Sequence, residues 1–383
     1  MFHIPEPPSD VRIERITCVD VVGTSPKMIG KNAVRDDHGS TTTERLVRVF
    51  TNTGHDGLGV TRVPVASMEA DDIPRALGAS PFAFADPASG IVLRGLEHAL
   101  WDVIGKVAGL PVYALLGGSV RSAVDAYDGA LYFCDLLDPA RGLARVAEEA
   151  TESVAHGHRA IKMKVGRGHR WMPSAEGFRR DVEAIRAVRR TVGPDIFLMI
   201  DGNNGFDRPG AERLLEEVGD QDLYWAEEMF PETIEDYEQF RTFLDRRRLR
   251  TLIAEGETLP DWPPIQPYLE RRLIDVVQLD MNQIGLSAWR RLAAFAETGG
   301  VRCSPHTWSS RFAVYASLHL GKAIPNFLSA EVPAYEPDAY RPAGFTFRDG
   351  QYIVSDMPGW GLVIDEPVYE SRYRAQEKRY EKQ

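Results

Sequence analysis

Seven titratable side chains recur at similar intervals through the middle of the chain, each after a short apolar run that could form a strand. They are Lys164, Asp201, Glu227, Glu257, Asp280, His306 and Glu331. The intervals are 23–37 residues, close to the length of one strand–helix unit in a parallel barrel. Because the carboxyl ends of parallel strands meet at one rim, we expect these side chains to converge there.

Three of these side chains, Asp201, Glu227 and Glu257, are carboxylates on successive predicted strands. Oxygen ligands suit Mg²⁺, and also Mn²⁺. The competing interpretation pairs the carboxylates with arginines of the chain, but their shared position at the rim favours a metal site. Glu255 and Glu257 would alternate onto the same face of a strand, so the third ligand stays open between them.

Lys162 and Lys164 share a face of a predicted strand, because side chains alternate with a period of two. Two ammonium groups held close disfavour each other's charge, so we expect a lowered lysine pKa. A lysine with a lowered pKa can act as a general base. Two solvated lysines are the alternative, and the facing carboxylates favour a catalytic role.

Asp280 and His306 end neighbouring predicted strands. A carboxylate that accepts a hydrogen bond from one imidazole nitrogen orients the ring and stabilises its charged form. We therefore expect His306 to be an acid or base, and Asp280 to hold it.

Alternation of short apolar runs with longer helical segments predicts the elements that position these residues. The strands are expected near Val124–Leu131, Ala160–Val165, Ile196–Asp201, Leu223–Glu227, Thr251–Ala254, Asp275–Asp280, Val301–Ser304 and Phe327–Glu331. Eight such units in succession are typical of an α/β protein with a (β/α)8 barrel of the TIM type. A doubly wound open sheet is the second choice, and the chain lacks the GxGxxG turn of its dinucleotide-binding form.

The two flanking regions differ from this pattern. Strand-like runs at Val11–Val22 and Leu46–Phe50 enclose a polar stretch, Gly23–Glu44, which we interpret as a mobile functional loop. The segment around Leu96–Ile104 predicts an amphipathic helix that ends at Gly109 and Pro111. After residue 335 the strand-like pieces in GFTFRDGQYIVS lack the barrel pattern, and we expect the tail to pack on the N-terminal part.

Composition excludes several classes of partner. The 383 residues are 43% hydrophobic and 26% charged, and the net charge of -11 comes from well-mixed signs. Such a chain has no basic surface for nucleic acid and no apolar stretch of roughly 20 residues for a membrane. MFHIPEPPSD does not resemble a signal peptide, and three widely spaced cysteines predict reduced thiols. We therefore expect a cytoplasmic protein.

The chain resembles the enolase superfamily, in its mandelate racemase subgroup, over nearly its whole length. The resemblance rests on ALWDVIGKVAGLPVYALLGG, IKMKVG, IDGNNGF, YWAEEMF, IAEGE, VVQLD and SPH in this order and spacing. Two departures are Met229, where the family usually has proline, and a longer step from Glu227 to Glu257, near the basic run at residues 246–250. Among members of the family, the chain is most similar to acid-sugar dehydratases of the tartrate type.

The resemblance implies an α+β capping domain built from both chain ends, residues 1–123 and 333–383, over a barrel at residues 124–332. It implies a Mg²⁺ ion held by Asp201, Glu227 and Glu257, and a homo-oligomer. It also implies Lys164 as the base on one face of the substrate and His306 on the other. Lys162 would tune Lys164 and touch the substrate carboxylate, and Glu331 would lie near the enolate oxygen.

These residues predict abstraction of the α-proton of a small carboxylate, which gives an enediolate. Dehydration of a sugar acid to a 2-keto-3-deoxy acid is the favoured outcome, since His306 could protonate a departing β-hydroxyl. Racemisation or epimerisation of a 2-hydroxy acid is the alternative, and a non-catalytic barrel is the remaining one.

Substrate choice is expected from loops near Gly23–Asn32, Gly59–Pro64 and Gly166–Pro173. Lys27, Arg62 and Trp171 in these loops are candidate substrate contacts, together with Asn203.

Overall fold

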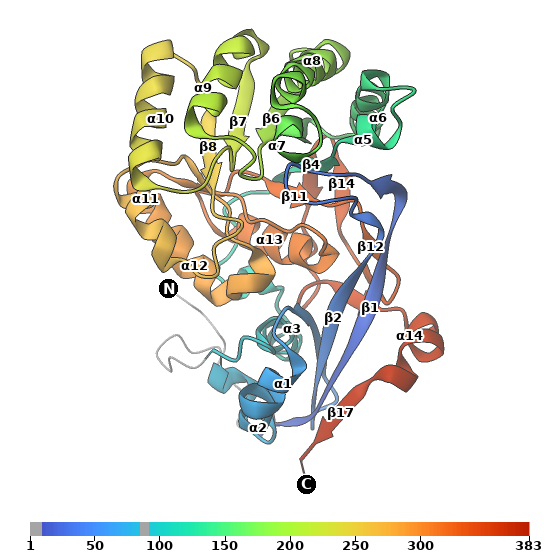
Figure 1. The fold of residues 1–383 in the computed structure, drawn as a ribbon. Helices are drawn as coiled ribbons and strands as arrows, with labels where there is room; N and C mark the ends of the chain where they lie inside the picture. The colour runs from blue at the N-terminus through green and yellow to red at the C-terminus, as the bar shows by residue number, and fades with distance from the viewer. Residues whose placement is uncertain (1–9, 85–91, 383) are drawn as a thin grey trace.

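The structure is a computed structural model that describes residues 10–84 and 92–382. The N-terminal segment examined above for a signal peptide falls mostly outside the described residues. Two sheets organise the molecule, a large one in the middle of the chain and a smaller one built from both flanking regions (Figure 1).

The larger sheet contains ten strands in the order β10-β9-β8-β7-β6-β5-β4-β15-β14, and β11 also pairs with β4. Its parallel strands are β4 (Val124–Leu131), β5 (Ala160–Lys164), β6 (Phe197–Asp201), β7 (Leu223–Glu227), β8 (Leu252–Glu255), β9 (Val276–Val277), β10 (Arg302–Cys303) and β11 (Ala330–Val332). The segment before β11 also reaches β10, since Leu328 N–H donates to the Cys303 carbonyl at 2.8 Å. The molecule is therefore an α/β protein with a large parallel sheet.

Helices surround these strands on the outside (Figure 1). They are α5 (Cys134–Leu137), α6 (Leu143–Ala155), α7 (Arg167–Arg170), α8 (Ser174–Val192), α9 (Arg208–Glu217), α10 (Ile234–Arg247), α11 (Gln266–Glu270), α12 (Met281–Gly299) and α13 (Arg311–Ala323). The strands read as continuous apolar runs because helices and the opposite strands bury both of their faces. Leu198 and Ile200 of β6, for example, are fully buried.

The smaller sheet has the order β12-β1-β2-β3, and β17 pairs with β1 as well. Its strands are β1 (Ile13–Ile29), β2 (Gly39–Thr51), β3 (Asp56–Thr61), β12 (Glu336–Pro337) and β17 (Lys378–Glu381). Helices α1 (Val65–Ser67), α2 (Ile73–Ala76), α3 (Glu97–Ala108) and α4 (Val112–Leu115) follow β3 in the chain. The predicted helix is α3, and it ends as expected at Gly109, which has a φ of 67°.

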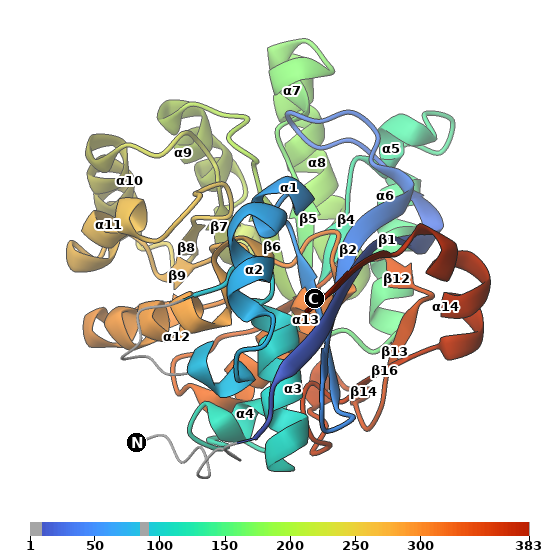
Figure 2. The same ribbon diagram turned by 90° about the horizontal axis from the view of Figure 1, so that it is seen from below.

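The polar stretch Gly23–Glu44 is mostly not a loop, and this expectation was wrong. β1 and β2 continue through it as an antiparallel hairpin, with Val22 opposite Thr43 and Thr24 opposite Thr41. Threonine is polar but β-branched, so it favours an extended strand as valine does. Only residues 30–38 turn the chain, and Figure 2 shows this end of the hairpin extending toward α7.

The tail packs on both sheets. β12 and β17 pair with β1, as the expected return to the N-terminal part requires. GFTFRDGQYIVS instead forms β14 (Thr346–Arg348) and β15 (Gln351–Ile353), and β15 pairs with β4 of the larger sheet. The remaining elements of the tail are β13 (Tyr340–Pro342), β16 (Leu362–Ile364) and α14 (Glu366–Arg372).

The three cysteines, Cys18, Cys134 and Cys303, are free and buried, as the sequence predicts. Across residues 10–84 and 92–382, none of the helices combines the length and apolar character needed to cross a bilayer.

Candidate active site

The site begins as a row of charged side chains across three neighbouring strands. In the register of the parallel sheet, Lys164 of β5 lies beside Asp201 of β6, and Asp201 lies beside Glu227 of β7. Each is the last residue of its strand. Residues paired side by side in a parallel sheet point to the same face, so strand register alone brings these three groups together.

Asp201, Glu227 and Glu257 have carboxylate oxygens within 4.8 Å of one another. Glu255 belongs to a second group, with Glu228 and Glu232. β8 ends at Glu255, and Gly256 follows with a φ of 116°, which breaks the strand alternation. The expectation that Glu255 and Glu257 share a face was therefore wrong, and Glu257 is the residue grouped with Asp201 and Glu227.

Lys162 and Lys164 are buried and ion-paired with the carboxylates. Lys162 Nζ lies 2.5 Å from Glu227, 3.2 Å from Asp201 and 3.1 Å from Glu331. Lys164 pairs with Asp201.

The expected lowering of a lysine pKa is wrong in this arrangement. Burial lowers the pKa of Lys164, and nearby Lys162 lowers it further, but Asp201, Tyr132 and Glu257 together outweigh both and raise it. For the pKa of Lys162, burial is outweighed in the same way by Glu227 and Glu331.

His306 and Asp280 form the expected pair. His306 Nδ1 lies 2.8 Å from Asp280 Oδ2, and Arg62 reaches the same Asp280 oxygen at 2.9 Å. His306 Nε2 lies 3.5 Å from Glu257 Oε2. Burial lowers the pKa of His306, but Glu257, Glu331 and the bond to Asp280 outweigh it and raise the pKa to about 9. The ring is therefore an imidazolium near neutral pH.

Glu331 and Asn203 complete the polar wall. Glu331 accepts a hydrogen bond from Thr307 N–H at 2.9 Å. Burial raises the pKa of Glu331, but Lys162 and His306 lower it below its usual value. Asn203 donates through Nδ2 to Glu257 at 3.3 Å, and its backbone N–H donates to Asp201 at 3.0 Å. Its φ of 42° is left-handed, a conformation that asparagine tolerates better than most residues.

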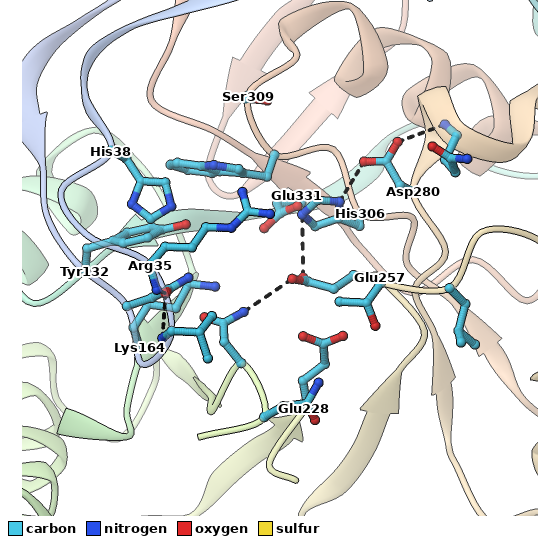
Figure 3. Close-up of a pocket in the computed structure, with 18 of the residues that line it drawn as sticks. Arg35, His38, Tyr132, Lys164, Glu228, Glu257, Asp280, His306, Ser309 and Glu331 are labelled. Carbon is cyan, nitrogen blue, oxygen red and sulfur yellow. Dashed lines mark hydrogen bonds and ion pairs between the residues drawn. The ribbon is translucent and has the colours of Figure 1, made fainter. Parts of the chain in front are cut away.

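A cavity of about 530 Å³ opens over these groups. Its lining includes Lys164, Asn203, Glu257, Asp280, His306, Glu331 and Arg62. Figure 3 shows Lys164 and His306 on different sides of this cavity, with Glu257 between them. Asp201, Glu227 and Lys162 are fully enclosed beneath it, since each side chain is 0% exposed.

Two of the candidate substrate contacts do not line the cavity. Lys27 pairs with Glu149 at 2.5 Å and donates to the Ala130 carbonyl at 3.2 Å. Trp171 donates through Nε1 to the Asn32 carbonyl at 2.6 Å, so it supports the hairpin turn from outside. Arg62 is the one of the three that lines the cavity.

The sequence interpretation expected a functional loop within Gly23–Glu44 but named no lining residue of the turn beyond Asn32, and it missed the lining from loops after β4, β8 and β10. These residues include Asn32, Val34, Arg35, His38, Tyr132, Thr258, Leu259, Pro260, Trp308 and Ser309. The predicted capping loop stopped at Asn32, so it ended where this lining begins. Recognising the threonine-rich stretch as a strand would have placed the turn at residues 30–38.

Aromatic rings join the hairpin turn to the larger sheet. The centroid of the His38 ring lies 4.9 Å from that of Tyr132 and 5.8 Å from that of Trp308. Trp308 lies 4.9 Å from Tyr132 and 5.5 Å from Tyr335. His38 meets Tyr132 and Trp308 edge-to-face, so ring contacts hold the turn over the cavity.

Comparison with known proteins shows the family of the chain. Residues 145–368 match the family described as Enolase C-terminal domain-like. A D-galactonate dehydratase family member of Streptomyces bingchenggensis is 30% identical over 93% of each chain.

Two solved structures are also close. A mutant galacturonate dehydratase from Geobacillus sp., complexed with Mg, has a TM-score of 0.91 at 29% identity, with both chains covered completely. A mandelate racemase/muconate lactonizing protein from Geobacillus sp. Y412MC10, complexed with magnesium/tartrate, has a TM-score of 0.88 at 30% identity, with 97% of each chain covered. The chain therefore belongs to the enolase superfamily.

Proposed function

We propose that the protein is a Mg²⁺-dependent dehydratase of sugar acids that removes the proton next to the substrate carboxylate. One observation carries the proposal. Lys164 and the His306–Asp280 pair border the same cavity as Glu257, whose carboxylate is grouped with those of Asp201 and Glu227. One relative named above is a D-galactonate dehydratase family member and another is a galacturonate dehydratase, which supports sugar acids as the class of substrate here.

The donor set fits a Mg²⁺ ion. Asp201, Glu227 and Glu257 offer only carboxylate oxygens, the ligands that Mg²⁺ prefers. Glu257 Oε2 is buried and accepts no hydrogen bond from the described residues. Mn²⁺ takes similar ligands, so it is a second candidate. When bound, the ion would hold the substrate carboxylate and offset the negative charge of the enediolate.

The side chains of the protein would move the protons. A Mg²⁺ ion held by Asp201 would offset the charge that raises the pKa of Lys164, and Lys164 could then accept the α-proton. Lys162 and Glu331 would lie near the enediolate oxygens. His306 would protonate the β-hydroxyl as it leaves as water. The imidazolium favoured by Asp280, Glu257 and Glu331 is the form that can do so.

We further propose that the parallel sheet closes as a (β/α)8 barrel. Pairing of β11 with β4 and the Leu328–Cys303 hydrogen bond support closure at the β10–β11 position. The barrel would span residues 124–332, and residues 1–123 and 333–383 would form the cap. A homo-oligomer and a cytoplasmic location also stay proposals, and sedimentation of the purified protein would test the first.

A screen of the protein with Mg²⁺ against aldonic, uronic and aldaric acids tests the activity. We expect at least one acid to give a 2-keto-3-deoxy product, detected by carbonyl trapping, and chiral analysis of recovered substrate would be run beside it. Inversion at the α-carbon without any keto acid, across the whole library, would replace the dehydratase with an epimerase.

A further inference from the structure

The turn of the β1–β2 hairpin carries a cation into the cavity without a counter-ion. Arg35 is exposed at the mouth of the cavity and lines it, and its guanidinium forms no ion pair or hydrogen bond with the residues that the structure describes. Figure 3 shows it entering from the side of His38 and Tyr132. Glu257 and Glu228 lie on the other side of this view.

Nearby cations differ from Arg35 because their charges are already matched. Lys31 pairs with Asp36 and, at 3.3 Å, with Asp37. Arg62 pairs with Asp280, and Lys164 pairs with Asp201. Among the described residues that line this end of the cavity, the unmatched positive charge is therefore that of Arg35.

The backbone that presents Arg35 is held on several sides. Arg35 N–H donates to Asn32 Oδ1 at 2.7 Å, and Asn32 N–H donates to the Arg35 carbonyl at 3.2 Å. Trp171 bonds to the Asn32 carbonyl, and Arg170 donates to the Val34 carbonyl at 2.8 Å. Such anchoring points to a recognition group, because an arginine that only improves solubility needs no fixed backbone.

We propose that Arg35 binds a second carboxylate of the substrate, so that the preferred substrate is an aldaric acid, a linear polyhydroxy acid with a carboxylate at each end. The proposal rests on the proposed function, in which the metal end of the cavity holds the first carboxylate. A guanidinium donates two parallel hydrogen bonds to a carboxylate, and a neutral hydroxymethyl group cannot accept both. A volume of about 530 Å³ accommodates a six-carbon diacid.

Matched acid pairs that differ only at the far carbon test the proposal. Galactarate against galactonate, and glucarate against gluconate, would be compared with wild type, Arg35→Gln and Arg35→Lys. We expect wild type to prefer one diacid over its monoacid by at least about tenfold in kcat/KM. Arg35→Gln should lower kcat/KM for that diacid by about 10- to 100-fold, mainly through KM. For the monoacid it should change the value by less than about threefold.

Lys31→Gln is the matched control, since it removes one positive charge from the same turn. Lys31 does not line the cavity and is paired with aspartates, so this variant should affect the diacid and the monoacid alike. Arg35→Lys keeps the charge but loses the paired donors, and it should recover only part of the diacid preference.

A binding measurement separates this proposal from the activity. Calorimetry with Mg²⁺-loaded protein would compare galactarate and galactonate in wild type and Arg35→Gln. Weaker binding of the diacid alone in the variant supports the assignment, even if neither acid is turned over and the proposed function fails. Equal loss for both acids, or a wild-type preference for the monoacid, would overturn it.

Discussion

Gly256 decides which glutamate at the end of β8 joins the candidate metal site. Its positive φ redirects the chain between Glu255 and Glu257, so the two carboxylates enter different groups. Tyr237 donates a hydrogen bond to Glu255, whereas Glu257 borders the cavity. At the scale of single residues, the φ of Gly256 therefore gives Glu255 and Glu257 different roles, although their side chains are chemically identical.

Asp201→Asn tests the metal site. Loss of one negative ligand should weaken Mg²⁺ binding and turnover by more than about 100-fold, while the fold is kept. Calorimetric Mg²⁺ titration, with circular dichroism as a check on folding, measures this. Glu255→Gln is the matched control, and its Mg²⁺ affinity should change by much less. Full turnover in chelator-treated wild type would exclude the metal dependence.

His306→Asn separates the two proton transfers. The variant should still exchange the substrate α-proton with solvent deuterium through Lys164, because the base is unchanged. Keto acid should form about 10²–10⁴ times more slowly, since no placed acid protonates the leaving hydroxyl. Lys164→Ala should lose both exchange and keto acid formation, because elimination requires removal of the α-proton. If exchange persisted in Lys164→Ala at the wild-type rate, another group would be the base.

At the scale of elements, α12 is two helical segments joined at Gly285, which has a φ of 77°. Glu97 of α3 accepts a hydrogen bond from Ser287 N–H at 2.6 Å and so caps the second segment. A carboxylate at a helix N-terminus also interacts favourably with the helix dipole. Because α12 starts directly after Asp280, this contact links α3 to the element that carries the partner of His306.

Gly285→Ala should disrupt this junction. The added Cβ would lie 2.0 Å from Glu97 Oε2, and the left-handed φ would be strained as well. We expect a loss of more than about 2 kcal/mol in the free energy of unfolding, measured with urea. Gly300→Ala is the matched control, since Gly300 caps the same helix with a φ of 73° and has nothing within 4 Å of the added Cβ. It should cost only about 1 kcal/mol. Equal losses of unfolding free energy in the two variants would show that the clash with Glu97 adds nothing to the strain of the left-handed φ.

The sequence predicts the central elements well, because each strand there is a short apolar run with a polar residue at its end. β4 and β7 coincide with the predicted Val124–Leu131 and Leu223–Glu227. β9 and β10 are only two residues long, since hydrogen-bond pairing rather than apolar content decides where a strand ends. The turn at residues 30–38 could not be assigned to the cavity, because contacts across hundreds of residues place it there.

At the scale of the whole molecule, buried side chains connect the larger sheet to both flanking regions. His319 of α13 is fully buried. Its Nδ1 accepts a hydrogen bond from Tyr113 N–H at 3.1 Å, and its Nε2–H donates to the Trp360 carbonyl at 3.1 Å. Only a neutral imidazole can make both bonds.

This junction should make the protein less stable in acid. Burial lowers the pKa of His319 to about 4, although the bond to Trp360 opposes this. As pH falls below about 6.5, the His319 imidazole is protonated in the unfolded chain. In the folded chain it stays neutral until about pH 4, so acid favours the unfolded state. This residue should therefore remove about 2 kcal/mol of unfolding free energy between about pH 7 and pH 5. Urea unfolding of wild type and His319→Gln at both pH values measures the difference. An unchanged pH dependence in the variant would contradict the assignment.

The pairing of β1 with β12 and β17 also sets an order of events during synthesis. The hairpin that places Arg35 and His38 leaves the ribosome early, but the strands on its outer edge are made near the end of the chain. At about 5–20 residues per second, roughly 15–65 s separate β2 from β17. During this interval one edge of β1 is open to pairing with other chains. The part of the cavity wall that is made first is thus the last to be secured, and a nascent chain is most exposed to misassembly at the region that we propose selects its substrate.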